Sequence, residues 1–264
     1  GVVVVATSLL ATLYVGSWQL IFCVVAGLIA GIAVGFIAEL YTSSDYKEVK
    51  ILAKESQTGH ATNIISGFSI GMQSTGLTIL LLAAGICASY LFFGMYGISL
   101  GAIGMLSTAG ITVSVDAYGP IADNAGGIAE MSKLGPQVRK ITDHLDSVGN
   151  TTAAVGKGFC IGSAAFTALA MIVAYANLAG LEMIDLLEPG VIIALLIGAM
   201  LPYFFTSLTI SSVGKAANHM IDEVRRQFKA DPGIMKGTSK PDYAQCVDIS
   251  TQAALKEMVI PGLI

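Results

Sequence analysis

Two groups of carboxylate and amide side chains interrupt an otherwise apolar sequence. The first contains Asp116, Asp123 and Asn124, and it follows a run from Ala61 to Val115 without any charged residue. Asp116 and Asp123 are seven residues apart, so a helix would place both carboxylates on nearly one face, two turns apart. An ionised aspartate in a membrane span usually faces a polar cavity or a cation. A helix that simply emerges into water would explain Asp123, but it explains Asp116 less well.

Pro120 lies between the two aspartates, and it is predicted to kink the helix or to free a backbone carbonyl there. Gly126 and Gly127 follow, and two glycines permit the close approach of a neighbouring helix or of a ligand. Together these features favour a functional site over an ordinary helix end.

The second group lies in the segment R-K-I-T-D-H-L-D-S-V-G-N-T-T-A-A-V-G-K-G, residues 139–158. Asp143, Asp146, Asn150 and Lys157 follow one another at helical spacing and share one stripe, on which Ala153 also lies. Oxygen ligands suit Mg²⁺, a hard cation that carboxylates often hold together with substrate phosphates. A lysine on the same stripe could meet anionic oxygens or the carboxylates themselves.

A second interpretation of this group is purely structural. Asp143 and Asp146 could belong to the first turn of a helix, where the helix dipole favours acidic residues. Asn150 is followed by two threonines and resembles a helix cap. Periodicity alone does not decide between these alternatives.

The composition places both groups in a membrane protein. Of the 264 residues, 54% are hydrophobic and only 12% are charged, whereas soluble domains carry about 25% charged residues. We predict an all-α, polytopic transmembrane helix bundle that forms a single domain over residues 1–264. It would have about five full spans and a truncated span at each end: Val2–Val15, Leu20–Leu40, Ala61–Phe93, Tyr96–Asp123, Asn150–Ala179, Gly190–Lys215 and a last one from about Thr251.

The basic residues predict the orientation of this bundle. All 14 Lys and Arg residues lie in or beside alternate connections, and the opposite connections contain none. By the positive-inside rule, the basic loops and both polar groups lie on the cytoplasmic side. After Gly190, the helix is predicted to continue beyond the membrane over Met220–Phe228, where Asp222 could pair with Arg226. The net charge of −4 says little about partners, and we predict no nucleic acid partner.

The motifs D-A-Y-G-P-I-A-D-N-A-G-G-I-A-E-M-S and I-T-D-H-L-D-S-V-G-N-T-T-A-A-V-G-K-G contain the two polar groups. They resemble the membrane-integral, ion-pumping inorganic pyrophosphatases, and so does the segment S-S-V-G-K-A-A-N-H-M-I-D-E-V-R-R-Q-F. The resemblance implies that the protein hydrolyses pyrophosphate on the cytoplasmic side, moves H⁺ or Na⁺ outward across the lipid bilayer and forms a homodimer.

The resemblance also implies roles for the residues of the two groups. Asp123 and Asn150 belong to the magnesium and pyrophosphate site, and the other members sit in the same motifs. The expected catalytic residues are Asp123 and Asp116; the metal ligands are Asp123, Asn150, Asp146 and Asp143; the substrate ligands are Asn124, Asn150 and Lys157. In general, Mg²⁺ bridges phosphate oxygens, and a carboxylate can orient an attacking water.

One position indicates the subtype within the family. In the potassium-independent members, a lysine stands where this chain has Ala153, and its ammonium takes the place of a monovalent cation. Ala153 and Gly156, which is one turn further on, leave room for K⁺. The cofactors expected from the resemblance are therefore Mg²⁺ and K⁺.

Two of the family's characteristic segments are absent, and the family's chains are much longer. Those segments are of the types D-x-G-A-D-L-V-G-K and G-G-A-W-D-N-A-K-K. We therefore expect this chain to be an internal portion that does not hydrolyse pyrophosphate alone. The alternative function is a secondary ion transporter whose intramembrane aspartates bind a coupling ion without hydrolysis. Against that alternative, both polar groups lie at one membrane face, and no inverted repeat is evident.

Overall fold

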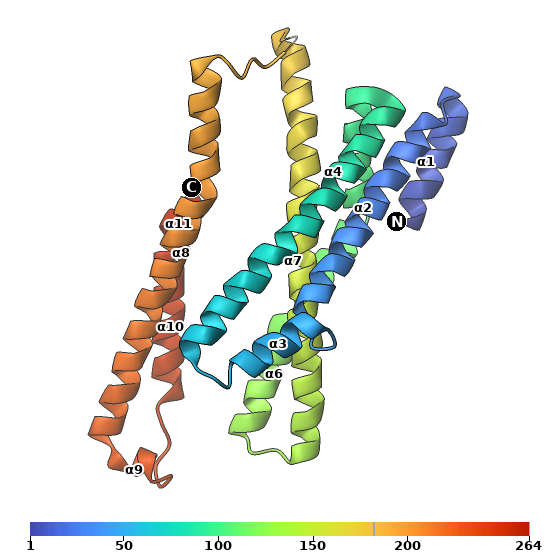
Figure 1. Cartoon of the computed structure of the whole chain (residues 1–264). Coiled ribbons are helices and arrows are strands. Elements are labelled where there is room, and N and C mark those ends of the chain that lie inside the picture. Colours follow the sequence, from blue (N-terminus) through green and yellow to red (C-terminus); the bar gives the residue numbers. More distant parts are fainter. Residues whose placement is uncertain (182, 264) are drawn as a thin grey trace. The chain divides into compact units, whose positions relative to one another are not determined.

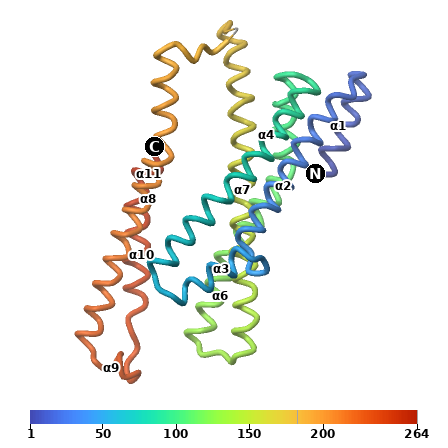
Figure 2. Tube along the Cα trace, in the orientation of Figure 1, coloured from blue at the N-terminus to red at the C-terminus, as the bar shows by residue number. Residues whose placement is uncertain are grey.

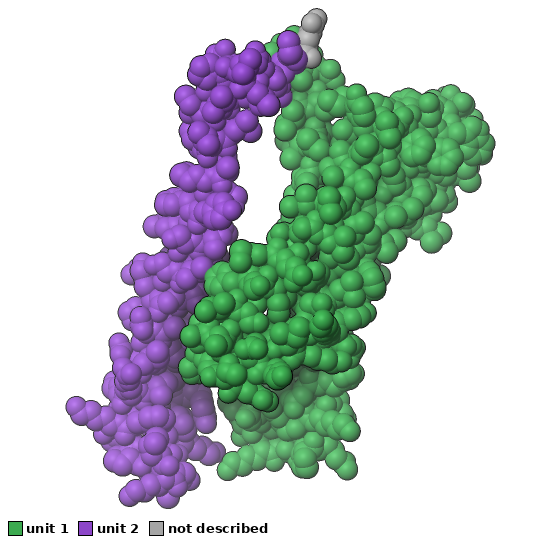
Figure 3. All heavy atoms as spheres, viewed as in Figure 1, with its two compact units in different colours: residues 1–182 green, residues 183–264 purple. Residues whose placement is uncertain are grey.

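The computed structural model describes residues 1–181 and 183–263, and every regular element in them is a helix. The chain divides into two compact units, residues 1–182 and 183–264 (Figure 3). The all-α class predicted from composition is confirmed, and four helices are long and apolar enough to cross a membrane. The expectation of one domain over the whole chain stays a prediction, so each unit is described by itself.

Unit 1 is a bundle in which long helices pack side by side with shorter ones at their ends (Figure 1). Its elements, in chain order, are α1 (Val2–Val15), α2 (Gln19–Thr42), α3 (Lys47–Glu55), α4 (His60–Leu106), α5 (Ala109–Asp116), α6 (Tyr118–Met131) and α7 (Pro136–Ala179). The first expected span is thus confirmed as α1, the second as α2, and the fifth lies wholly within α7.

Helix α4 reverses direction inside its own length. Phe93 and Gly94 have non-helical backbone angles, and Gly94 has a positive φ of 59°, which a residue without a Cβ adopts readily. The parts of α4 before and after this reversal, residues 60–92 and 95–106, are called its first and second legs. They pack against each other, since a Cβ on Gly97 would overlap the backbone of Ser89. The reversal falls where the sequence predicts a connection between the third and fourth spans, and the trace in Figure 2 shows the chain turning there.

The expected fourth span, Tyr96–Asp123, is one apolar stretch but not one helix. It is divided among the second leg of α4, all of α5 and the start of α6, with breaks at residues 107–108 and at Ala117. The second break has a covalent cause. Pro120 has no N–H to donate to the carbonyl of Asp116, and its ring clashes with the preceding turn, so α6 begins afresh at Tyr118.

Glycines allow α2 to approach the second leg of α4 at backbone distance. A Cβ on Gly104 would overlap the backbone of Val24, and a Cβ on Gly27 would overlap the backbone of Gly101. Small residues at membrane helix contacts let two backbones pack closely, which compensates for the missing hydrophobic drive between helices in lipid. The sequence predicts this packing role for the glycines of α2.

The core of unit 1 lies where α2, both legs of α4 and α7 meet. Phe166 of α7 is fully buried, and it would contact a Cβ placed on either Gly85 or Gly101, one on each leg of α4. The cluster around it consists of Ala30, Val34, Leu82, Ile98, Ala102, Met105, Phe159 and Phe166. This core holds the middle of α7 in place. It therefore also fixes the position of the polar end of α7 along the helix axis.

Unit 2 is built on one long helix, α8 (Pro189–Ala230), with α9 (Pro232–Met235), α10 (Tyr243–Glu257) and α11 (Val259–Leu263). Helix α10 returns along α8, and Lys215 of α8 forms an ion pair with Glu257 at 3.0 Å. Buried Gln227 joins the helix ends because it accepts from the Asp242 amide at 2.8 Å and donates to the Asp242 carbonyl at 3.0 Å. The predicted extension of the last full span beyond Lys215 is confirmed, and the stretch from Thr251 lies within α10 and α11.

We expect Gly104→Ala to destabilise the protein by about 1–3 kcal/mol, the usual range for overpacking a tight contact. The added methyl group would overlap the Val24 backbone, which cannot move without displacing α2. The measurement is the thermal unfolding midpoint of the full-length protein in detergent. Gly71→Ala on the same helix is the matched control because a Cβ there meets nothing within 4 Å. Equal midpoints for the two variants would contradict the packing described here.

Candidate functional site

The two polar groups of the sequence lie on two antiparallel helices, α6 and α7, whose backbones touch. A Cβ on Gly149 would lie 2.7 Å from the Cα of Gly119, and one on Gly119 would lie 3.1 Å from the carbonyl oxygen of Gly149. Further toward the connection between the helices, Arg139 Nη1 donates to the carbonyl oxygen of Gly126 at 2.9 Å. These contacts fix the register between the helices.

The register places the two groups at one level of the α6–α7 pair. Asp123 and Asn124 lie between the contact points Gly119 and Gly126 on α6. Asp143 and Asp146 lie in the facing interval of α7, between Arg139 and Gly149, and Asn150 follows Gly149 directly. The structure therefore brings together, at the same end of one helix pair, groups that are about 20 positions apart in the sequence.

The side chains on α7 are partly organised by their neighbours. Asn150 Nδ2 donates to Asp146 Oδ1 at 3.1 Å, which turns the amide oxygen of Asn150 away from the carboxylate. Arg139 Nη2 forms an ion pair with Asp143 Oδ1 at 3.1 Å, so Asp143 is partly neutralised by its own helix. Asp146 is thus the acidic residue of α7 that is coupled to an amide and not to a cation.

On α6, the two residues of the first group behave differently. Asn124 Nδ2 donates to the Pro120 carbonyl at 2.7 Å, a bond within its own helix. Asp123 is exposed and, in the described residues, makes no side-chain hydrogen bond or ion pair. Its carboxylate is therefore free to bind a ligand without breaking an existing contact.

These oxygens do not by themselves make a complete metal site. In residues 1–181 and 183–263, no three His, Cys, Asp or Glu side chains converge on one point. Mg²⁺ usually keeps several waters and is held by one or two carboxylates together with phosphate oxygens. Asp123 from one helix, with Asp146 and the Asn150 amide from the other, matches that chemistry, so the donor set fits Mg²⁺.

The structure excludes the helix-end interpretation of the α7 group. Helix α7 begins at Pro136, so Asp143 and Asp146 lie beyond the first turn and Asn150 lies well inside the helix. The interpretation of Asn150 as a helix cap is therefore wrong. Thr151 and Thr152 instead donate to the carbonyls four residues earlier, Ser147 and Val148. Helix-end electrostatics do not explain this acidic group.

Asp116 occupies a different place from Asp123, because the helix breaks at Ala117 between them. Its carboxylate faces α7, where a Cβ on Gly156 would lie 3.5 Å from Asp116 Oδ1. Ala153 is on the same stripe of α7, whereas exposed Lys157 makes no ion pair in the part of the chain described by the structure. The lysine is therefore not brought to the aspartates by contacts in this chain.

A cavity of about 370 Å³ between α2 and α7 was not foreseen from the sequence. It is lined by Glu39, Ser43 and Asp45 near the end of α2 and by His144 and Ser147 on α7, among others. The available signal was Glu39, an acidic residue inside an otherwise apolar helix. The cavity lies on the side of α7 that faces α2, whereas the aspartate stripe borders the contact with α6.

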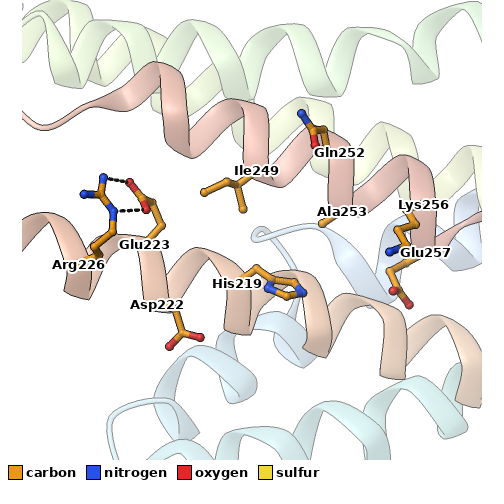
Figure 4. A pocket seen from close by; sticks show the side chains of 9 residues that line it. All are labelled: His219, Asp222, Glu223, Arg226, Ile249, Gln252, Ala253, Lys256 and Glu257. Carbon is orange, nitrogen blue, oxygen red and sulfur yellow. Dashed lines mark hydrogen bonds and ion pairs between the residues drawn. The ribbon is translucent and has the colours of Figure 1, made fainter.

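Unit 2 has a polar pocket of about 440 Å³ between α8 and α10 (Figure 4). On its wall, Glu223 accepts two hydrogen bonds from Arg226, at 2.7 and 2.8 Å. The expected pairing of Asp222 with Arg226 is therefore wrong, because the i,i+3 spacing lets the guanidinium bind the buried Glu223 in bidentate fashion. These bonds, and a further one from Gln227, lower the pKa of Glu223 to about 2.

Comparison with known proteins places the chain in a family. All of it, residues 1–264, matches the family model described as inorganic H⁺ pyrophosphatase. The chain belongs to this family of membrane-integral pyrophosphatases, which confirms the resemblance carried by the two motifs. Because its described residues include four long apolar helices, the chain is part of an integral membrane protein.

Three relatives illustrate the similarity. A Clostridium tetani protein whose name includes "K(+)-stimulated pyrophosphate-energized sodium pump" is 55% identical over 271 residues, which cover 100% of this chain and 40% of the relative. A "K(+)-insensitive pyrophosphate-energized proton pump" of Methanosarcina mazei is 48% identical over 97% of this chain and 40% of the relative. A "K(+)-stimulated pyrophosphate-energized sodium pump" of Thermotoga maritima is 46% identical over 92% of this chain and 35% of the relative. The chain thus spans 40% or less of the length of these relatives.

Gly149→Ala is expected to separate α6 from α7 at the level of the site and so to weaken the binding of Mg²⁺. The new methyl group would meet the Cα of Gly119, whereas Gly127→Ala, the matched control on α6, meets nothing within 4 Å. The measurement is the Mg²⁺ concentration that gives half-maximal protection of the full-length protein against thermal unfolding. We expect this concentration to rise about tenfold, as for loss of supporting shell residues at other metal sites. The same Mg²⁺ dependence in both variants would contradict this role of the glycine contact.

The ionised Glu223 is expected to stabilise the end of α8 in a pH-dependent way. Its pKa is about 2 in the folded protein and 4.5 ordinarily, so the stabilisation is present above about pH 4.5 and is lost as the pH falls toward 2. The protection of the Asp242 amide, which donates to Gln227, against hydrogen exchange should fall over that range. In Glu223→Gln it should not change there, while the Asp222→Asn control should behave like the wild type. A protection factor of the Asp242 amide that stays constant from pH 4.5 to 2 in the wild type would contradict this prediction.

Proposed function

We propose that the full-length protein containing this chain hydrolyses pyrophosphate at a Mg²⁺ site and couples the reaction to the transport of H⁺ or Na⁺ across the membrane. The observation that supports the proposal most directly is the α6–α7 register, in which the Gly119–Gly149 contact brings the segment of Asp123 to the level of Asp146. Family membership supports the same chemistry. The relatives' names describe pumps of both ions, so the transported ion is left as either.

In this proposal each side chain has a role that follows from its chemistry. Asp123 has no partner to release among the described residues, and its carboxylate holds and orients the attacking water or a metal-bound one. Asp146 and Asn150, already joined by a hydrogen bond, present oxygen atoms as one unit, and Asn124 and Lys157 supply donors to phosphate oxygens. Bound Mg²⁺ would neutralise charge on the phosphates. The remaining ligands come from outside this chain.

The proposal includes an orientation and a monovalent cation. The basic connections and the α6–α7 site lie on the cytoplasmic side, by the positive-inside rule. K⁺ activates the enzyme because Ala153 and Gly156 leave room for it, and two of the relatives carry potassium stimulation in their names. A homodimer in the bilayer is expected from the family resemblance, and crosslinking of the full-length protein in membranes would test it.

Asp123→Asn should reduce phosphate release from pyrophosphate by at least about 10³-fold, because it removes a charged group from the reacting centre. The assay uses the full-length protein in Mg²⁺ and K⁺. Asp222→Asn, an exposed aspartate on α8, is the matched control and should retain activity. Hydrolysis that survives in Asp123→Asn would refute the role of this carboxylate. A wild-type protein that transports ions without releasing any phosphate would instead favour the secondary transporter.

Ala153→Lys should remove the potassium requirement of the full-length enzyme. The ammonium group would occupy the space of the monovalent cation and supply its charge. The measurement is the rate of hydrolysis with and without K⁺ at saturating Mg²⁺ and substrate and at constant ionic strength. A wild-type rate that does not respond to K⁺ would contradict the assignment of the chain to the potassium-dependent subtype.

A further inference from the structure

We propose that Arg139 is a positioning residue of the Mg²⁺ site. Its guanidinium group would hold α6 and α7 at the separation that lets Asp123 and Asp146 share one hydrated Mg²⁺ ion. In the same proposal Asp143, which the motif suggested as a metal ligand, serves as the partner of Arg139 and lies outside the set of metal ligands. The inference rests on the proposed function and deepens it, because it names a residue on which that site depends.

The Arg139 side chain contacts both helices. Its Nη1 donates to the backbone carbonyl of Gly126 on α6 at 2.9 Å, and its Nη2 forms an ion pair with Asp143 Oδ1 on α7 at 3.1 Å. Nη1 also lies 3.3 Å from Glu130 Oε2, but the side chain of Glu130 is 73% exposed, so this contact adds little. Because the acceptor in Gly126 is a backbone atom, the bond holds the helix itself and not a flexible side chain.

Arg139 makes these contacts one helical turn from the residues that would bind Mg²⁺. On α6, Gly126 follows Asp123 by three residues, and on α7, Asp143 precedes Asp146 by three residues. A displacement of either helix at Arg139 would therefore be passed directly to the neighbouring turn, which carries the carboxylate of the site.

The contact of Arg139 is a second fixed point for the α6–α7 pair. The first is the backbone contact of Gly119 with Gly149, on the other side of Asp123. One contact fixes the register but leaves the helices free to pivot about it, whereas two contacts that enclose Asp123 also fix the angle between the helices. Gly126 itself faces α7, since a Cβ placed on it would lie 3.9 Å from the nearest α7 side chain.

The ion pair with Arg139 gives Asp143 a cation of its own, which Asp143 would have to give up in order to bind Mg²⁺. Among the described residues, Asp123 makes no side-chain hydrogen bond or ion pair, and Asp146 is bonded only to the amide of Asn150. Mg²⁺ usually takes one or two carboxylates together with waters and phosphate oxygens. Asp123 and Asp146 already supply that number.

The guanidinium group suits this role because it is planar and carries several donors. Two of its nitrogen atoms bind different acceptors at the same time, one on each helix. A lysine ammonium is a compact point charge on a flexible stem, and it lacks this fixed fork. Arg139→Lys would therefore keep the positive charge but lose the connection between the helices.

The first test measures Mg²⁺ binding without any reaction. The thermal unfolding midpoint of the full-length protein is followed as MgCl₂ is added at constant ionic strength. Arg139→Gln should raise the Mg²⁺ concentration for half-maximal stabilisation by about tenfold, as for the loss of supporting residues at other metal sites. A lower midpoint of Arg139→Gln with the Mg²⁺ dependence of the wild type would show a merely structural role and overturn the inference.

Lys140→Gln is the matched control for this test. It removes an equal charge from the next position of α7, and Lys140 is exposed and makes no ion pair in the part of the chain that the structure describes. Its Mg²⁺ dependence should match that of the wild type. The same rise in both variants would mean that net charge alone is responsible, which contradicts the inference.

The conservative variant separates the contacts of Arg139 from its charge. Arg139→Lys should show most of the loss of Mg²⁺ affinity that Arg139→Gln shows, because the connection between the helices is missing in both. This variant also keeps the proposal testable if Arg139→Gln does not fold. Full restoration of the wild-type Mg²⁺ dependence by lysine would overturn the inference.

A double variant tests the role of Asp143. Once Arg139→Gln has broken the ion pair, adding Asp143→Asn should change the Mg²⁺ dependence by less than about threefold, since the two residues act through one contact. A metal ligand would instead contribute separately. A clearly additive rise in the required Mg²⁺ concentration would therefore return Asp143 to the set of metal ligands and contradict its proposed role.

Phosphate release from pyrophosphate separates this inference from the proposed function. If Arg139→Gln weakens Mg²⁺ binding but the wild type releases no phosphate, the proposed function fails and the positioning role stands. If the wild type releases phosphate, and Arg139→Gln and Lys140→Gln need the same Mg²⁺ concentration for a half-maximal rate, this inference fails and the proposed function stands.

Discussion

The site depends on one backbone contact, where Gly119 of α6 meets Gly149 of α7. Two helices that approach this closely carry their flanking side chains to the same level, and the hydrogen bond from Arg139 to the Gly126 carbonyl supports the same register. Asp123 and Asp146 lie on one side of the contact, and Asp116 and Gly156 lie on the other. A single contact between residues without side chains thus positions both the carboxylates of Asp123 and Asp146 and the approach of Asp116 to Gly156.

The position of that contact along α7 is fixed because the middle of α7 is held in the apolar core of unit 1. Phe166 is fully buried against both legs of α4; α2 holds the second leg through the Gly27–Gly101 approach and the first through the contact of Ala30 with Gly85. The polar end of α7, by contrast, carries few buried side chains. The apolar core therefore determines the position of α7 along its axis, and the Gly119–Gly149 contact determines which residues of α6 lie opposite its polar end.

Much of this arrangement could be predicted from the sequence, and the limits have physical causes. Hydropathy predicts α2 and α7, and charge alternation predicts the reversal at Gly94, because both are properties of single segments. The pairing of Glu223 with Arg226 instead of Asp222 depends on which acid is buried, which spacing does not reveal. Likewise, periodicity aligns Asp116 with Asp123, but Pro120 breaks that helix. That Asp116 faces Gly156 depends on the register between α7 and the segment around Asp116. The sequence of a single segment does not reveal this register.

The charges of the α6–α7 site argue for the order in which a phosphate ligand would bind. On α6 and α7, together with Asp116, five negative charges (Asp116, Asp123, Glu130, Asp143 and Asp146) meet three positive ones (Arg139, Lys140 and Lys157), which leaves two negative charges. A bare pyrophosphate anion would be repelled by such a surface. Cations must therefore bind first or arrive with the substrate. In the proposed function, carboxylates that bind metal ions, and not a basic pocket, would therefore hold the anion at this end of the helix pair.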